Sequence, residues 1–511
     1  MRRPVLALFS LLALAAPVAA SVEPASSRAV LPTALGSTSP TFGLVKTQSS
    51  TRMTVYTDSE GDYFYVDFNL GVYAAAANEP FEIRAVRRSY NQPIEATRVT
   101  AGGTRVLPAG LISDFNGLTD FATIKLIDSR RRVALTQTVD FCPNGNAQRI
   151  KKDAPIDAYY PDGCGGGNPY SLGAVWGLQR GYAVPLQGED SYLEGSESPM
   201  PKAGRYRAEI KVNPAYVQAL GIPAKAAKAT VTVTVKVVVE DDDEEEFRSA
   251  HSPSSRPTLA APARSRKPSK PASIPADAPK PDLRSLPAWS IAADGDYVVF
   301  AATVWNAGAS PLLVDGFRRS GADIMDAYQY VVDGNGKQVG YQKVGTMVWD
   351  PREEHHHWHF KDFARYSLVD KNKKQLFVSK KEAFCLANTD AVDYTVPGAD
   401  WHPYNTELET ACGEHSSLAV REVLAAGSGD TYEQFRPGQS LSLKGRANGT
   451  YYVKVEANPS RKLAESDVTN NVSYRKIIVG GKPGRRTVKA EKVGIIDEPV
   501  YDDEFLERFR H

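Results

Sequence analysis

Residues 230–237 read TVTVTVKV, in which valine alternates with threonine or lysine. An alternation with a period of two is typical of a β-strand that buries one face. Residues 121–127 (FATIKLI) alternate in a similar way, and residues 53–56 (MTVY) and 63–68 (YFYVDF) are of types that favour strands. Turn residues separate these runs. The pattern predicts an all-β protein whose residues 51–239 form a β-sandwich-like domain of unknown role.

A change of composition ends this domain. Residues 240–246 are seven consecutive acids, and residues 249–281 contain eight prolines among many serine, alanine and basic residues. A block of like charges is usually solvated, although calcium binding is an alternative. The proline-rich stretch has too little apolar surface to form a core and predicts an extended, semi-stiff linker. We therefore expect an acidic run and a linker over residues 240–280.

A second folded unit is expected over residues 281–480. Residues 297–305 (YVVFAATVW) and 450–457 (TYYVKVEA) have the composition of strands, and an asparagine follows each of them. The unit is therefore predicted to be β-rich like the first one. Residues 481–511 are expected to be a charged tail without a clear pattern.

The N-terminus predicts export. The first twenty residues read MRRPVLALFSLLALAAPVAA, with Arg2 and Arg3 ahead of a short apolar run and small residues at the end. This arrangement is typical of a secretory signal peptide. Residues 21–50, rich in serine, threonine, alanine and proline, are expected to be a flexible leader. No later segment has the roughly 18 consecutive apolar residues that a transmembrane helix needs, so we expect a secreted or extracytoplasmic protein.

Four cysteines are consistent with that compartment. An even number in an exported chain predicts two disulfides. Proximity in the sequence favours Cys142–Cys164 and Cys385–Cys412, with four buried thiols as the alternative. The formal net charge is +1, so charge offers no argument for a nucleic-acid partner.

Four of the eight histidines lie within residues 355–359, which read HHHWH. If this segment is a strand, His355, His357 and His359 share one face, and His356 and Trp358 share the other. Three imidazoles on one face suit a divalent transition metal, of which copper binds most tightly. The alternatives are adventitious binding at a histidine-rich surface, a structural or catalytic zinc site, and a cupin-like iron or manganese site.

Short motifs around the histidines recur in one family. They are Pro281-Asp282-Leu283, Val304-Trp305-Asn306-Ala307-Gly308, His355-x-His357-x-His359 with Asp362, Phe363, Tyr366, Leu368 and Asp370, Lys381-Glu382-Ala383-Phe384-Cys385-Leu386, Asp430-Thr431-Tyr432, and Glu465-Ser466-Asp467-Val468-Thr469-Asn470-Asn471. In this order and spacing they resemble the catalytic domain of the lysyl oxidase family, over roughly residues 281–479.

The resemblance implies a copper-dependent amine oxidase. Such enzymes oxidise primary amines, as peptidyl lysine or small amines, to aldehydes with dioxygen, and they release hydrogen peroxide and ammonia. Copper would be held by His355, His357 and His359. The organic cofactor would be lysine tyrosylquinone, formed from Lys381 and Tyr432, with Lys380 as the alternative lysine. The protein would supply positioning and electrostatics around that cofactor.

The resemblance also implies a calcium site that ties the start of the domain to its end. Its ligands would be Asp282, the Leu283 carbonyl, Glu465, Asp467, Asn470 and Asn471. Oxygen-only ligands suit a hard cation. The alternative is a polar loop whose residues hydrogen-bond to one another.

The chain also departs from the family pattern. The family usually has an additional histidine or cysteine just before the copper triplet and a histidine shortly after it; this chain has residues 350–354 (DPREE) and Arg365-Tyr366 there. The catalytic base is therefore not assigned, and Asp362 is suggested by proximity alone, with a turn role as its alternative. Two other functions stay open: a copper-binding envelope or matrix protein without catalysis, and a zinc-dependent hydrolase.

Overall fold

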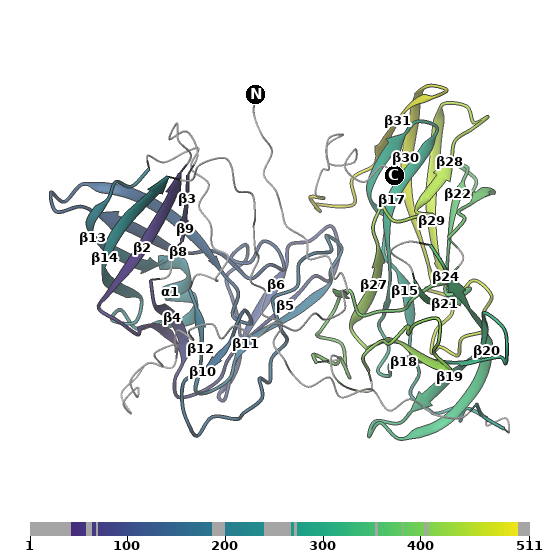
Figure 1. The fold of residues 1–511 in the computed structure, drawn as a ribbon, viewed down its shortest axis with the longest axis horizontal. Coiled ribbons are helices and arrows are strands. Elements are labelled where there is room, and N and C mark those ends of the chain that lie inside the picture. The colour runs from purple at the N-terminus through teal and green to yellow at the C-terminus, as the bar shows by residue number, and fades with distance from the viewer. Residues whose placement is uncertain are drawn as a thin grey trace.

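The computed structural model describes residues 42–57, 64–67, 70–186, 200–239, 267–269, 273–352, 356–381, 383–402, 406 and 408–498. They form two β-rich lobes, an N-terminal and a C-terminal one (Figure 1). The all-β prediction is confirmed, since the described residues include a single short helix. No helix in these ranges is long and apolar enough to cross a membrane. The expected signal peptide and the acidic run lie outside the described residues.

The N-terminal lobe contains three sheets. The largest has the order β3 (Phe64–Asp67), β2 (Ser50–Thr57), β14 (Lys228–Val239), β13 (Gly204–Val212), β8 (Leu118–Ile127) and β9 (Val133–Phe141). The second has the order β1 (Gly43–Lys46), β4 (Val72–Ala76), β12 (Tyr182–Pro185) and β10 (Gln148–Arg149). The third has the order β11 (Gly173–Leu178), β5 (Phe81–Val86), β6 (Glu95–Thr100) and β7 (Gly103–Val106).

Strand β14 shows why the alternating sequence folds as it does. Val231, Val233 and Val235 are buried in the core of the lobe, whereas Thr234 and Lys236, on the other face of the strand, are exposed. The strand pairs antiparallel with β13 on one side and parallel with β2 on the other. Each buried valine contributes about 1.5–3 kcal/mol relative to an exposed one. The predicted alternation therefore corresponds to a central strand.

The helix α1 (Pro214–Leu220) follows β13 directly. The side chain of Asn213 accepts a hydrogen bond from the Ala215 amide, and Pro214 occupies the first helical position, where its missing N–H costs nothing. Gly221 ends the helix in a left-handed conformation with φ of 68°. These residues explain why a short helix forms between strands β13 and β14.

The C-terminal lobe also contains three sheets. One has the order β15 (Leu283–Ser285), β17 (Tyr297–Asn306), β27 (Ser428–Tyr432) and β25 (Asp390–Ala391), with β16 (Trp289–Asp294) and β28 (Ser440–Ser442) also paired to β17. Another has the order β24 (Ala383–Phe384), β21 (His357–Lys361), β20 (Gln338–Asp350), β19 (Ile324–Val332), β18 (Leu312–Arg318) and β26 (Ala419–Leu424). The last has the order β23 (Gln375–Val378), β22 (Ala364–Val369), β29 (Gly449–Ala457), β30 (Val472–Lys482) and β31 (Arg485–Ala490).

Two strands extend the folded lobes beyond the boundaries expected from sequence. Strand β1 lies within the segment expected to be a leader, because Phe42 and Leu44 are buried and the strand pairs with β4. Strand β31 lies within the expected charged tail. Arg485 and Lys489 face solvent on this edge strand, a position where charged side chains are common.

Both predicted disulfides are present. Cys142 is bonded to Cys164 in the N-terminal lobe, and Cys385 is bonded to Cys412 in the C-terminal lobe. The second of these lies directly after β24, which pairs with the strand that carries the histidines. The alternative of four free thiols is therefore wrong.

The packing of β14 predicts a graded response to truncation. Val233→Ala is expected to lower the free energy of unfolding by about 2 kcal/mol, because it leaves a cavity in the core. Thr234→Ala, on the exposed face of the same strand, should change it by less than about 0.5 kcal/mol. Urea unfolding of the full chain measures both, and equal effects would contradict the assigned faces.

Candidate functional site

Strand β21 (His357–Lys361) carries the histidines beside β20. In the antiparallel register Val348 faces His359 and Asp350 faces His357. His357 and His359 lie on one face of the strand, while Trp358 points to the opposite face, where its indole N–H donates to the Glu414 carbonyl. His356 precedes the strand, is exposed, and its Nε2 lies 3.1 Å from the Pro351 carbonyl oxygen. His355 lies outside the described residues.

The two strand histidines point at the same space. Their Nε2 atoms are 2.9 Å apart, and their rings meet edge to face. Two nitrogens bound to one metal at about 2.0–2.1 Å, and about 90° apart, would be separated by about 2.9 Å. The pair therefore fits two adjacent ligands of one ion. Within the described ranges, which exclude His355, there is no group of three or more His, Cys, Asp or Glu that could hold a metal.

The protonation of these imidazoles suits a metal ligand. Burial lowers the pKa of His357 to about 4, with Asp350 opposing the shift. His357 is therefore neutral at neutral pH, which is the form that coordinates a metal. His359 is 1% exposed, so its ring is held by the surrounding side chains.

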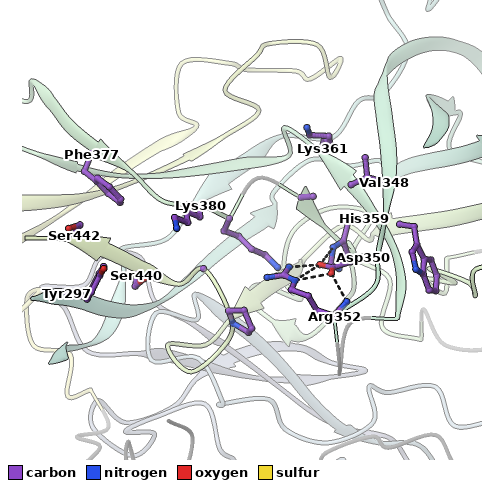
Figure 2. Close-up of a pocket in the computed structure, with 15 residues that line it drawn as sticks. Tyr297, Val348, Asp350, Arg352, His359, Lys361, Phe377, Lys380, Ser440 and Ser442 are labelled. Carbon is purple, nitrogen blue, oxygen red and sulfur yellow. Dashed lines mark hydrogen bonds and ion pairs between the residues drawn. The ribbon is translucent and has the colours of Figure 1, made fainter. Parts of the chain in front are cut away.

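Asp350 and Arg352 lie next to His359 (Figure 2). An Asp350 carboxylate oxygen lies 3.3 Å from His359 Nδ1. Arg352 donates to the same carboxylate through Nε and Nη2, and this guanidinium holds the pKa of Asp350 well below its usual range. A carboxylate on one ring nitrogen orients the other toward a metal. Asp350 is thus placed to direct His359 Nε2 toward His357.

Lys381 lies between β23 (Gln375–Val378) and β24 (Ala383–Phe384). It is 5% exposed, and its Nζ is 4.1 Å from the centre of the Tyr432 ring. Nζ is buried and forms no hydrogen bond within the described residues. Burial lowers the pKa of Lys381 to about 8, with Asp430 opposing the shift. The neighbouring Lys380 is exposed, so Lys381 is the lysine that lies against the tyrosine.

Tyr432 is the last residue of β27 (Ser428–Tyr432). Its hydroxyl donates to the Cys385 carbonyl and accepts from the Cys385 amide, each at 3.0 Å. Its ring packs against Phe384 at 5.3 Å in a T-shaped arrangement. Burial raises the pKa of Tyr432 well above its ordinary value. The phenol is therefore neutral and is fixed at both its ring and its oxygen.

Two buried acids accompany this pair. Asp430 precedes Tyr432 by two residues on the same strand, so both side chains point to the same face. Asp430 Oδ2 and Glu422 Oε1 are buried without a hydrogen-bond partner among the described residues. Burial raises the pKa of both carboxyls well above the ordinary value. Lys381 opposes that shift at Asp430, so the amine and this carboxyl interact electrostatically.

Asp430 belongs to one of the sequence motifs without a role of its own, and Glu422 lies in none of them. The period-two placement of residues 430 and 432 on one strand face was a signal that could have singled out Asp430. Asp362, which had been suggested by proximity, adopts a left-handed φ of 65° between β21 and β22 (Ala364–Val369), and its carboxylate lies 3.7 Å from Lys462 Nζ. It does not line the pocket beside the histidines, and its position is that of a turn residue.

A pocket of about 680 Å³ opens beside these groups. Figure 2 shows His359, Asp350 and Arg352 at one end, Tyr297, Phe377 and Ser442 at the other, and Lys380 between them. Lys381 and the backbone around Gly438 also line it. The pocket is large enough to admit a lysine side chain, and Lys381 is one of the residues at its wall.

The residues considered for calcium lie together. Asn470 Nδ2 donates to Asp282 Oδ1 at 2.9 Å, and Asn471 Nδ2 donates to Glu465 Oε1 at 2.9 Å. The Leu283 amide donates to Glu465 Oε2, so the start and the end of the lobe are joined. The second Asp282 oxygen accepts from a guanidinium, that of Arg284.

Comparison with known proteins shows which family this region resembles. Residues 327–484 match the family model described as "Lysyl oxidase". The chain is 31% identical to protein-lysine 6-oxidase from Homo sapiens over 126 residues, which are 24% of this chain and 26% of that protein. It is 25% identical to lysyl oxidase homolog 2 from Xenopus tropicalis over 142 residues (28% of this chain, 17% of the relative). It is 28% identical to lysyl oxidase homolog 4 from Mus musculus over 131 residues (25% and 15%).

The predicted resemblance to lysyl oxidases in the C-terminal half is thus confirmed. The matched segment includes His357, His359, Lys381 and Tyr432, and excludes the whole N-terminal lobe. The chain spans about a quarter or less of the length of these three relatives.

The buried amine predicts a pH-dependent effect on stability. The folded pKa of about 8 for Lys381 lies below the ordinary value of 10.5. The unfolded chain therefore binds more protons between these values, and the stability of the wild type rises with pH across that window. Lys381→Met in copper-free protein should stabilise the fold by up to about 3 kcal/mol at pH 7.

This gain should vanish near pH 10.5. Lys380→Met, at the exposed neighbour, is the matched control and should change little at any pH. Urea unfolding of the full chain at several pH values measures both variants. A Lys381→Met effect that is independent of pH would contradict the burial of a titrating amine.

Proposed function

We propose that the C-terminal lobe is a copper-dependent amine oxidase of the lysyl oxidase type, an oxidoreductase acting on CH–NH2 donors. It oxidises primary amines, in peptidyl lysine or small molecules, to aldehydes with dioxygen, and releases hydrogen peroxide and ammonia. The observation that carries the proposal is the buried Lys381 amine 4.1 Å from the centre of the Tyr432 ring, beside a histidine pair. We include in the proposal export through the signal peptide.

His357 and His359, together with His355, would hold copper, since their imidazoles are the donors that this ion favours. Copper and a lysine tyrosylquinone made from Lys381 and Tyr432 would supply, when present, the redox chemistry and a carbonyl that condenses with the substrate amine. Asp350 keeps the His359 ring oriented. The buried side chains of the site would position the reacting groups and accept the proton of Lys381.

The Lys381 amine could add to the Tyr432 ring only after copper and dioxygen had oxidised that ring, and the amine would have to lose a proton to do so. A pKa of about 8 leaves a useful fraction of the amine neutral near neutral pH. Asp430 Oδ2 is the buried acceptor with no other described partner. We therefore assign to Asp430 the proton from Lys381 Nζ, while the Cys385 backbone holds the phenol oxygen in place.

The pocket provides the path for substrate. It leads from solvent to His359 and Lys381, and the aromatic and serine side chains at its far end can contact the remainder of an amine substrate. Its size excludes a folded domain but not an extended lysine side chain. Peptidyl lysine on an exposed loop and small amines are both compatible with this shape.

A calcium ion is the second part of the proposal. Asp282, Leu283, Glu465, Asp467, Asn470 and Asn471 would bind it through oxygen. The support is that Asn470 Oδ1 and Asn471 Oδ1 are buried without hydrogen-bond partners among the described residues, inside a cluster of acids. Such an ion would join the start of the lobe to its end.

Removal of each key side chain tests the amine oxidase. In full-length protein loaded with copper, Lys381→Ala should abolish quinone staining and amine-dependent peroxide release but leave copper bound. His357→Ala should abolish copper binding as well, whereas Lys380→Ala should still bind copper and stain for the quinone. A fully active Lys381→Ala protein would refute the cofactor assignment.

The wild type itself separates the alternative functions. Bound copper with no turnover would favour a copper-binding protein without catalysis. Metal-dependent hydrolysis would favour a zinc enzyme.

The assignment of Asp430 makes a kinetic prediction. Asp430→Asn should slow quinone formation about 100-fold at pH 7, since a positioned proton acceptor contributes about 10²–10⁴. Copper content should not change. Raising the pH should recover part of the rate, because Lys381 then loses its proton to solvent; its pKa in this variant should lie below the wild-type value, since the charge of Asp430 that raises it is gone. Unchanged kinetics at pH 7, followed by absorbance after addition of copper, would remove Asp430 from this role.

The calcium proposal is tested by thermal unfolding. Calcium at 100 times its dissociation constant should stabilise the fold by about 2.7 kcal/mol, and magnesium should stabilise it less because it demands a smaller, stricter site. Asn470→Ala should remove the calcium response. Equal melting temperatures with calcium and with chelator would leave the hydrogen-bonded polar loop as the correct description.

A further inference from the structure

The N-terminal lobe contacts the sheet that contains Tyr432. Strands β5, β6 and β11 lie on the side of this lobe that faces the C-terminal lobe (Figure 1). The segment before β11, residues 164–172, is here named the docking loop. The Leu172 amide at its end donates to the Val392 carbonyl at 2.7 Å, and the Tyr394 amide donates to the Gly173 carbonyl at 3.0 Å. The loop is thus hydrogen-bonded beside β25 (Asp390–Ala391).

Tyr170 anchors the docking loop in the C-terminal lobe. Its ring is fully buried in a cluster with Trp289, Trp305 and Val392. Its hydroxyl donates to Glu498 Oε1 at 2.5 Å and accepts from the Arg475 guanidinium. A buried tyrosine of this kind contributes both apolar area and a specific hydrogen bond, so the loop has one defined position.

Asn168, in the docking loop, contacts strand β27 on the face opposite to Tyr432. It is 3% exposed, and its Nδ2 donates to Thr303 Oγ1 at 2.7 Å and lies 3.5 Å from Thr431 Oγ1. The two threonine hydroxyls are 2.6 Å apart across the β17–β27 pair. The side-chain oxygen of Asn168, Oδ1, accepts from the Tyr170 amide. All three side chains are therefore joined in one hydrogen-bonded group.

The register of β27 connects this group to the site. Thr431 lies between Asp430 and Tyr432 and points to the opposite face of the strand. A shift of Thr431 along or away from β17 would therefore move both neighbours. Asn168 touches neither the Tyr432 ring nor Lys381, and its effect on them passes through the strand. Neither Asn168 nor Thr303 lies in the segment that matches the lysyl oxidase family.

We infer that the N-terminal lobe is a positioning element of the amine oxidase site, in which Asn168 fixes strand β27 and so sets Tyr432 and Asp430 against Lys381. This inference rests on the proposed function. Its physical basis is the steep dependence of reactivity on geometry, since a displacement of about 1 Å can cost about 100-fold in rate. A buried amide hydrogen-bonded to two threonines resists such a displacement, because leaving it without partners is costly.

The experiment uses the full chain and two readouts. The first is hydrogen–deuterium exchange of residues 428–432 in copper-free protein, which does not depend on any activity. The second is the rate of quinone formation after copper and oxygen are added. Asn168→Ala should speed exchange in this strand about tenfold and slow quinone formation between about 10-fold and 100-fold. Copper binding should stay at the wild-type level.

Matched variants separate positioning from general damage. Thr431→Val removes the hydroxyl that Asn168 approaches and should reproduce the Asn168→Ala result, whereas Thr431→Ser keeps the hydroxyl and should restore wild-type behaviour. Asn91→Ala, at an exposed asparagine of the same lobe, should have no effect. Faster exchange throughout both lobes of Asn168→Ala would overturn the inference, because the residue would then act on overall stability.

The two proposals can fail separately. If the wild type forms quinone and Asn168→Ala forms it at the same rate with unchanged exchange in β27, the positioning inference is overturned and the proposed function stands. If the wild type forms no quinone, the proposed function fails. In that case, faster exchange confined to β27 in Asn168→Ala would still support the inference that Asn168 fixes this strand. Unchanged exchange in β27 would overturn that inference.

Discussion

The burial of the Lys381 amine against the ring of Tyr432 is the contact on which the rest of the site depends. A lysine amine taken out of water loses its hydration, and the fold offers Nζ no hydrogen bond among the described residues in return. The surrounding structure must therefore supply the stability that keeps it there. Phe384 and Tyr432 enclose the amine, and the Cys385–Cys412 disulfide holds the segment whose backbone binds the tyrosine hydroxyl.

Three sheets of the C-terminal lobe converge on this contact. The strand pair β20–β21 brings the two histidines, β27 brings Asp430 and Tyr432, and the connection from β23 to β24 brings Lys381. Each group alone has an ordinary explanation: a histidine-rich strand, a core tyrosine or a buried lysine. Their closeness to one another is what distinguishes a candidate site from three local features, since Lys381 lies against Tyr432 and lines the same pocket as His359. Asp430 and Glu422, each with one carboxyl oxygen that lacks a hydrogen-bond partner among the described residues, lie close enough to Tyr432 to influence its pKa.

The sequence predicted the parts of this structure that depend on local patterns. Alternation in residues 230–237 identified a strand with the correct buried face, and cysteine spacing identified both disulfides. Lys381 and Tyr432 were predicted as the cofactor residues from the resemblance to the lysyl oxidase family and not from any local pattern. The contact between Asn168 and Thr303 joins residues 135 positions apart, so no local pattern could reveal it. Strand β31 was missed because its charged sequence gains its structure only by pairing with β30.

Mass spectrometry of the full chain after exposure to copper and oxygen tests the pairing of Lys381 with Tyr432. A cofactor made from these two residues predicts a proteolytic fragment in which their peptides are covalently joined, and its absence from copper-free protein and from Lys381→Ala. Recovery of the Lys381 and Tyr432 peptides only in separate, unmodified form, from protein that has bound copper, would contradict it.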